Sequence, residues 1–309
     1  MSMDPRVGRV EAEGGAGMRM KGTREDQSSA TSRDLLVIGP GVLGRLFASK
    51  WKEENASARL VGETATNLNH EELKEVGCFD GIRTREDATT DEGKFPFVLF
   101  SAPPSGSENY LEEVERAASK WDGTGCFLFT GSAAVYDLEH GECTEVSKIK
   151  EMGSSERTDR LLNCENAVLG KGGSVARLVG LYHSKRGAHM YFLKIQNVPR
   201  WGDSVINLIH YEDAADLCYS IMTGERKGEV FLGCDSNPIS FQKMMDATLM
   251  SGEYTGHFKF TGEEQEFAGK LASNNQTREA LGWKPKFESF ESFMSAGARD
   301  KFSGLSEER

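Results

Sequence analysis

From Asp34 onward, short apolar runs typical of buried strands alternate with segments in which apolar residues recur at helical spacing. Residues 35–39 form a short apolar run ending in glycine, which predicts a strand buried on both faces of a parallel sheet. Residues 42–54 then place Leu43, Phe47 and Trp51 on one face of a predicted helix. Because such strand–helix units recur, we expect an α/β fold built on a doubly wound parallel Rossmann sheet.

The later elements repeat this alternation and then become irregular. We expect further strands at 58–62 and 174–182, a strand that runs into a Pro-rich loop at 95–104, and a strand followed by a turn at 125–136. Further helices are expected at 70–77, 109–121 and 156–172. These patterns predict a dinucleotide-binding domain over 34–183. The shorter elements beyond it predict a smaller C-terminal substrate-binding part over 184–309. Residues 1–33 hold almost no large apolar side chains and predict a disordered tail.

A glycine-rich turn joins the first predicted strand to the first predicted helix. Residues 39–44 read G-P-G-V-L-G, which matches the dinucleotide-binding pattern G-x-G-x-x-G in its strand–turn–helix setting. Gly39 permits the tight turn, Gly41 lets a pyrophosphate approach, and Gly44 lets helix and strand pack closely. The amides of Val42 and Leu43 open the helix and face the phosphates. We therefore expect a nicotinamide dinucleotide, NAD or NADP, at this turn.

An acidic residue follows the second predicted strand. Glu63 lies about 20 residues beyond the glycine turn, where such folds read the adenosine ribose. A carboxylate accepts hydrogen bonds from a ribose diol and repels a 2′-phosphate, which favours NAD. The alternatives are a surface glutamate after a strand, and a 2′-phosphate held by Arg45 or Arg59.

Charge and cysteine content exclude several classes of partner. The 309 residues carry a formal net charge of −11, which repels phosphate backbones and anionic membranes. We therefore expect neither nucleic acid nor a membrane as a partner. The six cysteines form no C-x-x-C pair, and no histidine pair sits at ligand spacing, so we expect no metal site. Free thiols favour the cytoplasm as the compartment.

Six sequence motifs together carry a resemblance to a known family. They are GPGVLG at 39–44, FSAPP at 100–104, FTGSAAVYD at 129–137, RLVGLY at 177–182, NLIHYEDAADL at 207–217 and LGWKP at 281–285. The chain resembles the extended and atypical short-chain dehydrogenase/reductases over about 34–290. It is most similar to their NAD-dependent epimerase/dehydratase group, and within that group to plant-type members. The plant likeness adds a plastid as the alternative compartment, and related folds suggest a homodimer.

The resemblance assigns roles to individual positions. It implies that Ser132 hydrogen-bonds the reacting oxygen and that Ala102 and Pro103 pass over the adenosine side of the cofactor. The substrate pocket of this group begins near residues 182–189, a stretch that holds basic residues and two histidines. We take Tyr182, Arg186 and His210 as candidate substrate contacts. The alternatives are a turn role for Ser132 and a solvated basic loop at 182–189.

The family's catalytic pair is missing. The resemblance implies a Tyr-x-x-x-Lys motif on a helix, yet no tyrosine of this chain is followed four residues later by lysine. Arg157 or Thr158 stands at the tyrosine position, and Leu161 or Leu162 at the lysine position. Arginine stays protonated and is no base, but it binds anions and stabilises a developing oxyanion. Tyr182 is an alternative source of a tyrosine.

Two functions are consistent with these motifs. The first is an NAD(P)-dependent oxidoreductase or epimerase that acts on a small polar substrate, such as a nucleotide sugar or a carbonyl compound. Its candidate catalytic residues are Ser132, Arg157 and Thr158. The second is a dinucleotide-binding sensor or assembly protein that has lost catalysis together with the Tyr-x-x-x-Lys pair.

Overall fold

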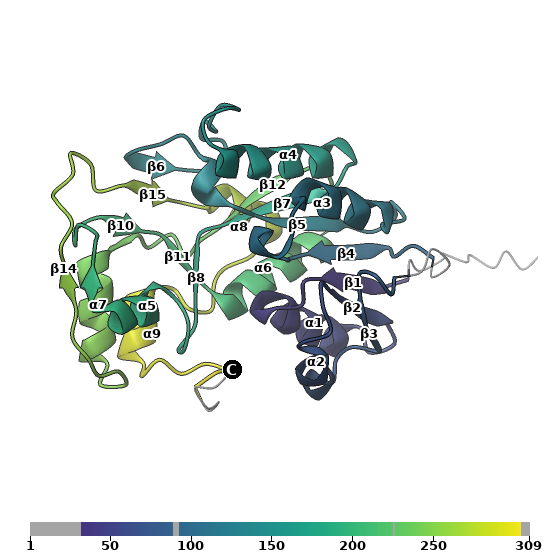
Figure 1. Cartoon of the computed structure of the whole chain (residues 1–309), viewed down its shortest axis with the longest axis horizontal. Helices are drawn as coiled ribbons and strands as arrows, with labels where there is room; N and C mark the ends of the chain where they lie inside the picture. The colour runs from purple at the N-terminus through teal and green to yellow at the C-terminus, as the bar shows by residue number, and fades with distance from the viewer. Residues whose placement is uncertain (1–31, 89–92, 225, 304–309) are drawn as a thin grey trace, which may run out of the picture. The chain divides into compact units, whose positions relative to one another are not determined.

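The computed structural model describes residues 32–88, 93–224 and 226–303 (Figure 1). The expected tail over 1–33 therefore lies almost entirely outside the described residues. The described chain contains one large sheet, formed by β1 (Leu35–Ile38), β2 (Leu60–Thr64), β3 (Gly81–Thr84), β4 (Phe97–Phe100), β5 (Phe127–Ser132), β7 (Ser174–Leu178) and β12 (Val230–Gly233). The strands are parallel and lie in the order β12-β7-β5-β4-β1-β2-β3. This order confirms the predicted doubly wound Rossmann sheet.

Helices cover both faces of the sheet, as Figure 1 shows. They are α1 (Val42–Glu54), α2 (His70–Val76), α3 (Tyr110–Ser119), α4 (Glu156–Gly170) and α6 (Tyr211–Thr223). Alternate residues of a strand point to opposite faces. Leu35 and Val37 therefore join the core shared with α1 and α6, whereas Leu36 and Ile38 join the core shared with α3 and α4. Burial on both faces explains the continuous apolar run in the sequence.

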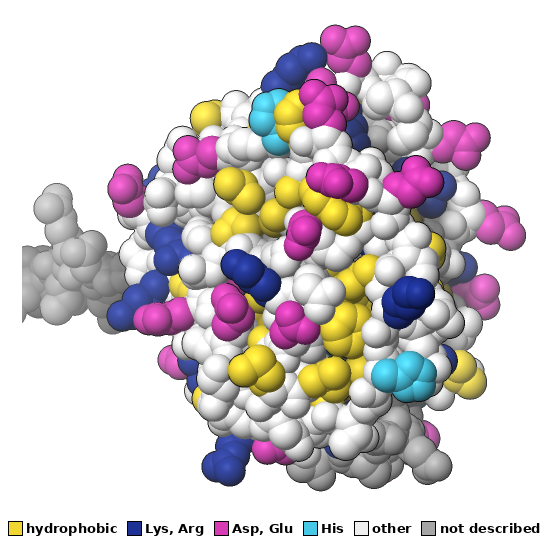
Figure 2. All heavy atoms as spheres, turned by 90° about the vertical axis from the view of Figure 1, so that its left-hand side faces the viewer, with side chains coloured by type: hydrophobic (Ala, Val, Ile, Leu, Met, Phe, Trp, Pro, Cys, Tyr) yellow, Lys and Arg dark blue, Asp and Glu magenta, His cyan; other side chains and the backbone are white. Residues whose placement is uncertain are grey.

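The chain beyond residue 183 is divided between the sheet layer and a smaller part. Helix α6 and strand β12 return to the sheet layer. The shorter elements of the described chain are β6 (Gly141–Cys143), β8 (Gly180–Tyr182), α5 (Ala188–Ile195), β9 (Asn197–Val198), β10 (Val205–Ile206), β11 (Leu208–His210), β13 (Ile239–Ser240), α7 (Phe241–Met250), β14 (Lys259–Phe260), β15 (Lys270–Ala272), α8 (Asn275–Leu281) and α9 (Phe290–Ser295). Helices α5, α7 and α9 share a separate apolar core. Figure 2 looks onto this part, where acidic, basic and apolar side chains are mixed.

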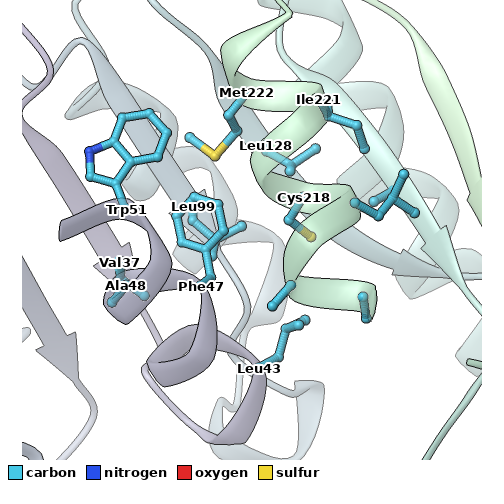
Figure 3. Close-up of a cluster of buried hydrophobic side chains, with 14 of the residues drawn as sticks. Val37, Leu43, Phe47, Ala48, Trp51, Leu99, Leu128, Cys218, Ile221 and Met222 are labelled. Atoms are coloured by element: carbon cyan, nitrogen blue, oxygen red, sulfur yellow. The ribbon is translucent and has the colours of Figure 1, made fainter. Parts of the chain in front are cut away.

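Helix α1 packs against α6 in the core on one face of the sheet (Figure 3). Trp51 of α1 is fully buried, with its ring 4.8 Å from Phe97 and 5.6 Å from Phe47. Its indole nitrogen donates to the Arg33 carbonyl at 2.9 Å, so the one polar atom of the ring is satisfied. Figure 3 places Met222 of α6 across from this aromatic pair. No helix within the described ranges has the length and apolar character needed to cross a bilayer.

A histidine and an aspartate connect the C-terminal segment to the sheet layer. His210 ends β11, and its Nδ1 accepts from the Glu212 amide at 3.2 Å, which caps α6. Its Nε2 lies 3.1 Å from Asp300, which also accepts from the amide and the hydroxyl of Ser184, each at 2.7 Å. Burial raises the pKa of Asp300, but the hydrogen bonds from His210 and Ser184 outweigh burial and hold the pKa below its ordinary value.

Two further carboxyl groups are buried nearby. Asp213 accepts from the amides of Lys286 and Phe287 at 2.7 and 3.1 Å, yet burial still raises its pKa to about 6. Asp235 is 2% exposed, and burial raises its pKa to about 7. Its Oδ2 atom has no hydrogen-bond partner among the described residues, and neither has the hydroxyl of Tyr182. Because burial disfavours its charged form, the Asp235 carboxyl is easier to ionise in the unfolded chain.

This arrangement predicts a pH-dependent stability. A carboxyl whose pKa rises from 3.8 to about 7 on folding stabilises the protein below pH 4 and loses that contribution as the pH approaches 7. Asp235→Asn removes the titrating group, so the variant should gain stability relative to the parent protein between pH 4 and pH 8, by at most about 1.4 kcal/mol per pH unit. Urea unfolding at several pH values measures this difference. The exposed Asp203→Asn is the control, and parallel pH curves for Asp235→Asn and the parent protein would contradict the prediction.

Candidate functional site

The glycine turn after β1 has the geometry that each of its glycines was expected to provide. Gly39 has φ +76°, and a Cβ atom there would lie 2.4 Å from the Ala102 backbone. A Cβ on Gly44 would lie 3.0 Å from the Ser101 hydroxyl and 3.1 Å from Val37. Nothing lies within 4 Å of the Cβ position of Gly41, which faces open space. The turn is therefore packed against protein at Gly39 and Gly44 and open to solvent at Gly41, as a phosphate-binding turn requires.

The N-terminus of α1 opens into this space. Its N-cap residue is Gly41, which has no side chain to satisfy the first amides of the helix. The amides of Val42 and Leu43 are therefore available to a ligand, and the helix dipole favours a negative charge there. Both residues line a large cavity of about 640 Å³, which contains the carboxyl ends of β1, β4, β5 and β7.

The loop after β4 separates the large cavity from a small one of about 280 Å³. Ser101, Ala102 and Pro103 line both cavities, as do Gly39 and Gly41. The Ser101 hydroxyl donates to the Gly39 carbonyl at 2.9 Å. The two cavities therefore meet at the glycine turn, on either side of the loop that the resemblance assigned to the cofactor.

Glu63 is the residue before the end of β2 and lies in the wall of the small cavity, and its carboxylate is already paired. It is 1% exposed. The Arg83 side chain, which belongs to the neighbouring strand position in β3, donates to it at 3.0 Å. Arg116 of α3 approaches the other carboxylate oxygen to 2.6 Å. Glu63 is thus a buried carboxylate held by two guanidinium groups.

Two further arginines in the small cavity also have acidic partners. Arg45 of α1 pairs with Glu72, and Arg85 pairs with Glu113 at 2.6 Å. The expected alternative phosphate ligand Arg45 therefore lines the cavity, whereas Arg59 does not. Four arginines therefore share three carboxylates here, which offset most of the positive charge in this half of the site.

Ser132 lines the large cavity at the end of β5. Its hydroxyl oxygen accepts from the Ala134 amide at 3.2 Å, at the start of the 3₁₀ turn Ala133–Val135. Accepting this bond leaves the hydroxyl proton available to a ligand in the cavity. The turn role and the chemical role expected of Ser132 are compatible, because they use different parts of the hydroxyl.

Helix α4 brings arginine, and not threonine, to the cavity. Arg157 and Arg160 line it together with Leu161. Thr158 is buried outside the cavity, where its hydroxyl accepts from Ser155 at 2.9 Å beside the helix N-cap. Arg157 and Leu161 share one helical face and both line the cavity, whereas Thr158 does not line it.

Of the three candidate substrate contacts, one lines the cavity. Arg186 does so, on a loop closed by reciprocal backbone hydrogen bonds with His183. Tyr182 and His210 are fully buried outside it. Tyr211 is the tyrosine beside Arg186 in the cavity wall. Burial raises its pKa, against the opposing effect of the Arg186 guanidinium.

Comparison with known proteins shows which other proteins share this fold. No family model matches the chain, and no curated protein matches its sequence. Several solved structures do match in fold. A conserved protein of unknown function from Silicibacter pomeroyi has a TM-score of 0.67 at 18% identity, covering 86% of this chain and 98% of its own. A UDP-glucuronic acid 4-epimerase from Bacillus cereus, in complex with UDP-glucuronic acid and NAD, has a TM-score of 0.69 at 14% sequence identity. The match covers 86% of this chain and 98% of the epimerase. A dTDP-glucose 4,6-dehydratase from Bacillus anthracis, in complex with NAD, has a TM-score of 0.65 at 13% sequence identity. The match covers 86% of this chain and 95% of the dehydratase.

The fold is that of NAD-binding epimerases and dehydratases. These identities establish the fold alone, and they give no support to the finer likeness to plant-type members. The expected epimerase/dehydratase type of Rossmann fold is confirmed at this level.

Sequence reasoning missed several residues of the site wall. Arg83 belongs to a strand that the sequence pattern did not reveal, and Arg116 carries no local signal of its contact with Glu63. Tyr211 follows the buried run at 207–210 and reads as the start of a helix. Arg157 was already a candidate from the sequence, and Arg160, three residues further along α4, lines the cavity with it. In the described part of the chain, no group of three or more His, Cys, Asp and Glu side chains could hold a metal ion.

The Glu63 pairing leads to a prediction about stability. Glu63→Gln should lower the free energy of unfolding by about 3 kcal/mol, because it leaves the buried Arg83 charge without its carboxylate. Urea unfolding measures the loss. Glu71→Gln breaks the exposed pair with Lys74 and should change the stability little. Equal effects of the two substitutions would mean that the Glu63 carboxylate is not held by its arginines.

Proposed function

We propose that this protein binds a nicotinamide dinucleotide across the two cavities. The observation that supports this most strongly is the glycine turn, which lies where the two cavities meet and is open at Gly41. The adenosine half would occupy the small cavity and the nicotinamide half the large one. The pyrophosphate would lie between them, on the free amides of Val42 and Leu43.

The residues of the small cavity bear on the choice of cofactor. Glu63 supports the expected preference for NAD, because a carboxylate accepts from the ribose diol. Arg83 and Arg116 neutralise it, however, and Arg45 and Arg85 line the same cavity. We therefore infer a weak preference for NADH over NADPH, within about tenfold in dissociation constant.

The reaction class follows from the nicotinamide half. A bound nicotinamide supplies hydride transfer, and the fold is shared with proteins named as epimerases and dehydratases of nucleotide sugars. We propose an oxidoreductase or epimerase acting on a small polar substrate. In this role the Ser132 hydroxyl donates a hydrogen bond to the reacting oxygen, and Arg157 stabilises the negative charge that develops on that oxygen.

The second candidate is a dinucleotide sensor without catalysis. The observation that favours it is Arg157 at the tyrosine position, with apolar Leu161 at the lysine position. Neither side chain exchanges protons near neutral pH. Turnover of a nucleotide-sugar panel with bound NAD separates the two candidates. We further propose that the protein acts in the cytoplasm, with a plastid as the alternative compartment, and that it forms a homodimer.

The cofactor site can be tested by closing its open face. Gly41→Asp should abolish NADH binding, because the carboxylate would project into the space left for the pyrophosphate while meeting no protein atom within 4 Å. Fluorescence titration of the full chain with NADH and NADPH measures the affinity. Gly170→Asp is the matched control, since Gly170 also has open space and lines neither cavity. Unchanged NADH affinity in Gly41→Asp would refute the assigned site.

The chemical role of Ser132 can be tested once a substrate turns over. Ser132→Ala should lower the turnover number about 10²-fold, the usual loss when one donor to a developing oxyanion is removed. NADH affinity should stay unchanged, since the substitution removes no phosphate contact. Turnover that is unaffected by the substitution would remove Ser132 from the mechanism.

A further inference from the structure

The walls of the large cavity carry charge of one sign. Among the described residues that line it, the charged side chains are Arg157, Arg160 and Arg186, and no aspartate or glutamate is among them. The chain as a whole has 48 acidic and 37 basic residues. Three unopposed arginines therefore stand out against an acidic protein, and their field attracts anions into the cavity.

The small cavity provides an internal comparison. Its arginines Arg45, Arg85 and Arg116 each have a carboxylate within ion-pair distance. Arg157, Arg160 and Arg186 have no carboxylate at that distance in the described part of the chain. The difference cannot be assigned to a general surplus of arginine, because both sets lie at the same edge of the same sheet. The arginines of the large cavity are left for an external partner.

The geometry positions these arginines for one ligand. Arg157 and Arg160 are three residues apart and share a face in the first turns of α4, where the helix dipole adds positive potential. Arg186 comes from a different element, the loop after β8. That loop is fixed, because Asp300 accepts two hydrogen bonds from Ser184. Two elements distant in sequence thus bring guanidinium groups to one space.

The pyrophosphate of the cofactor does not account for these charges. Its expected place is the glycine turn after β1, whereas α4 packs against β5 and β7. Strand β4 lies between β1 and β5 in the sheet. Two strand spacings amount to roughly 10 Å. The arginines therefore lie beyond the pyrophosphate, on the nicotinamide side of the cavity.

We propose that Arg157, Arg160 and Arg186 bind a compact oxyanion, a carboxylate or a phosphate, carried by a second ligand beside the nicotinamide half of the site. This inference rests on the proposed function for its place next to the cofactor. Guanidinium groups suit such anions because their planar donors pair with two oxygens at once. Being permanently charged, they hold the anion without removing a proton from it.

The test uses the full chain saturated with NADH, so that the glycine turn is not available to the probe. Sodium phosphate and sodium succinate are titrated separately at constant ionic strength, and binding is followed by calorimetry and by NADH fluorescence. Arg157→Gln and Arg160→Gln each remove one exposed guanidinium group. Arg200→Gln is the matched control, since Arg200 is also exposed and lines neither cavity.

The expected result is saturable binding of one probe, weakened about tenfold or more in Arg157→Gln and Arg160→Gln but not in Arg200→Gln. The preferred probe identifies the anion as a phosphate or a carboxylate. Equal binding in all variants, or no saturable binding of either probe, overturns the inference. NADH affinity is measured on the same samples. A protein that binds NADH but neither anion refutes only this inference, and one that fails to bind NADH refutes the proposed function.

Discussion

Strand β1 pairs in parallel with both β2 and β4, and the rest of the site depends on that double pairing. The chain leaves β1 on one side of the sheet and leaves β4 on the other, so the loops at their carboxyl ends diverge. The turn at Gly39 lies in the space between them, and its backbone lies against Ala102. A side chain at position 39 would push these two segments apart and remove the support of both cavities.

Local pattern predicted the elements that form this frame. The helix predicted at 42–54 and the strand at 35–39 match the structure within one residue, because burial of both sheet faces imposes a strong periodicity. The strand predicted at 174–182 is divided at Val179, where the chain passes from the large sheet to a pairing with β11. Such a change of partner leaves no trace in an apolar run.

The missed contacts depend on register and not on local pattern. Glu63 was expected to face a ribose, and its position at the end of β2 follows from the sequence. Its engagement by Arg83 follows only from the pairing of β2 with β3, since the two residues are register partners. Arg116 reaches the same carboxylate from α3 across the sheet edge. Patterns within one segment carry no information about which residue of another segment will lie opposite.

The two halves of the site differ in how their charge is treated. In the small cavity each arginine has a carboxylate within ion-pair distance, so most of the positive charge is offset within the protein. In the large cavity the balancing charge is absent from the wall. A site of this kind is electrostatically complete only when it is filled.

The attachment of the Arg186 loop to Asp300 bears on how the protein is made. Asp300 stands near the end of the chain, and the loop that it fixes follows β8, more than a hundred residues earlier. During synthesis the sheet strands up to β7 emerge and can pair before Asp300 has been synthesised. The nascent chain can therefore form its glycine turn well before it can hold Arg186 in place. The loop that carries Arg186 gains this support only after Asp300 has been synthesised and has left the ribosome.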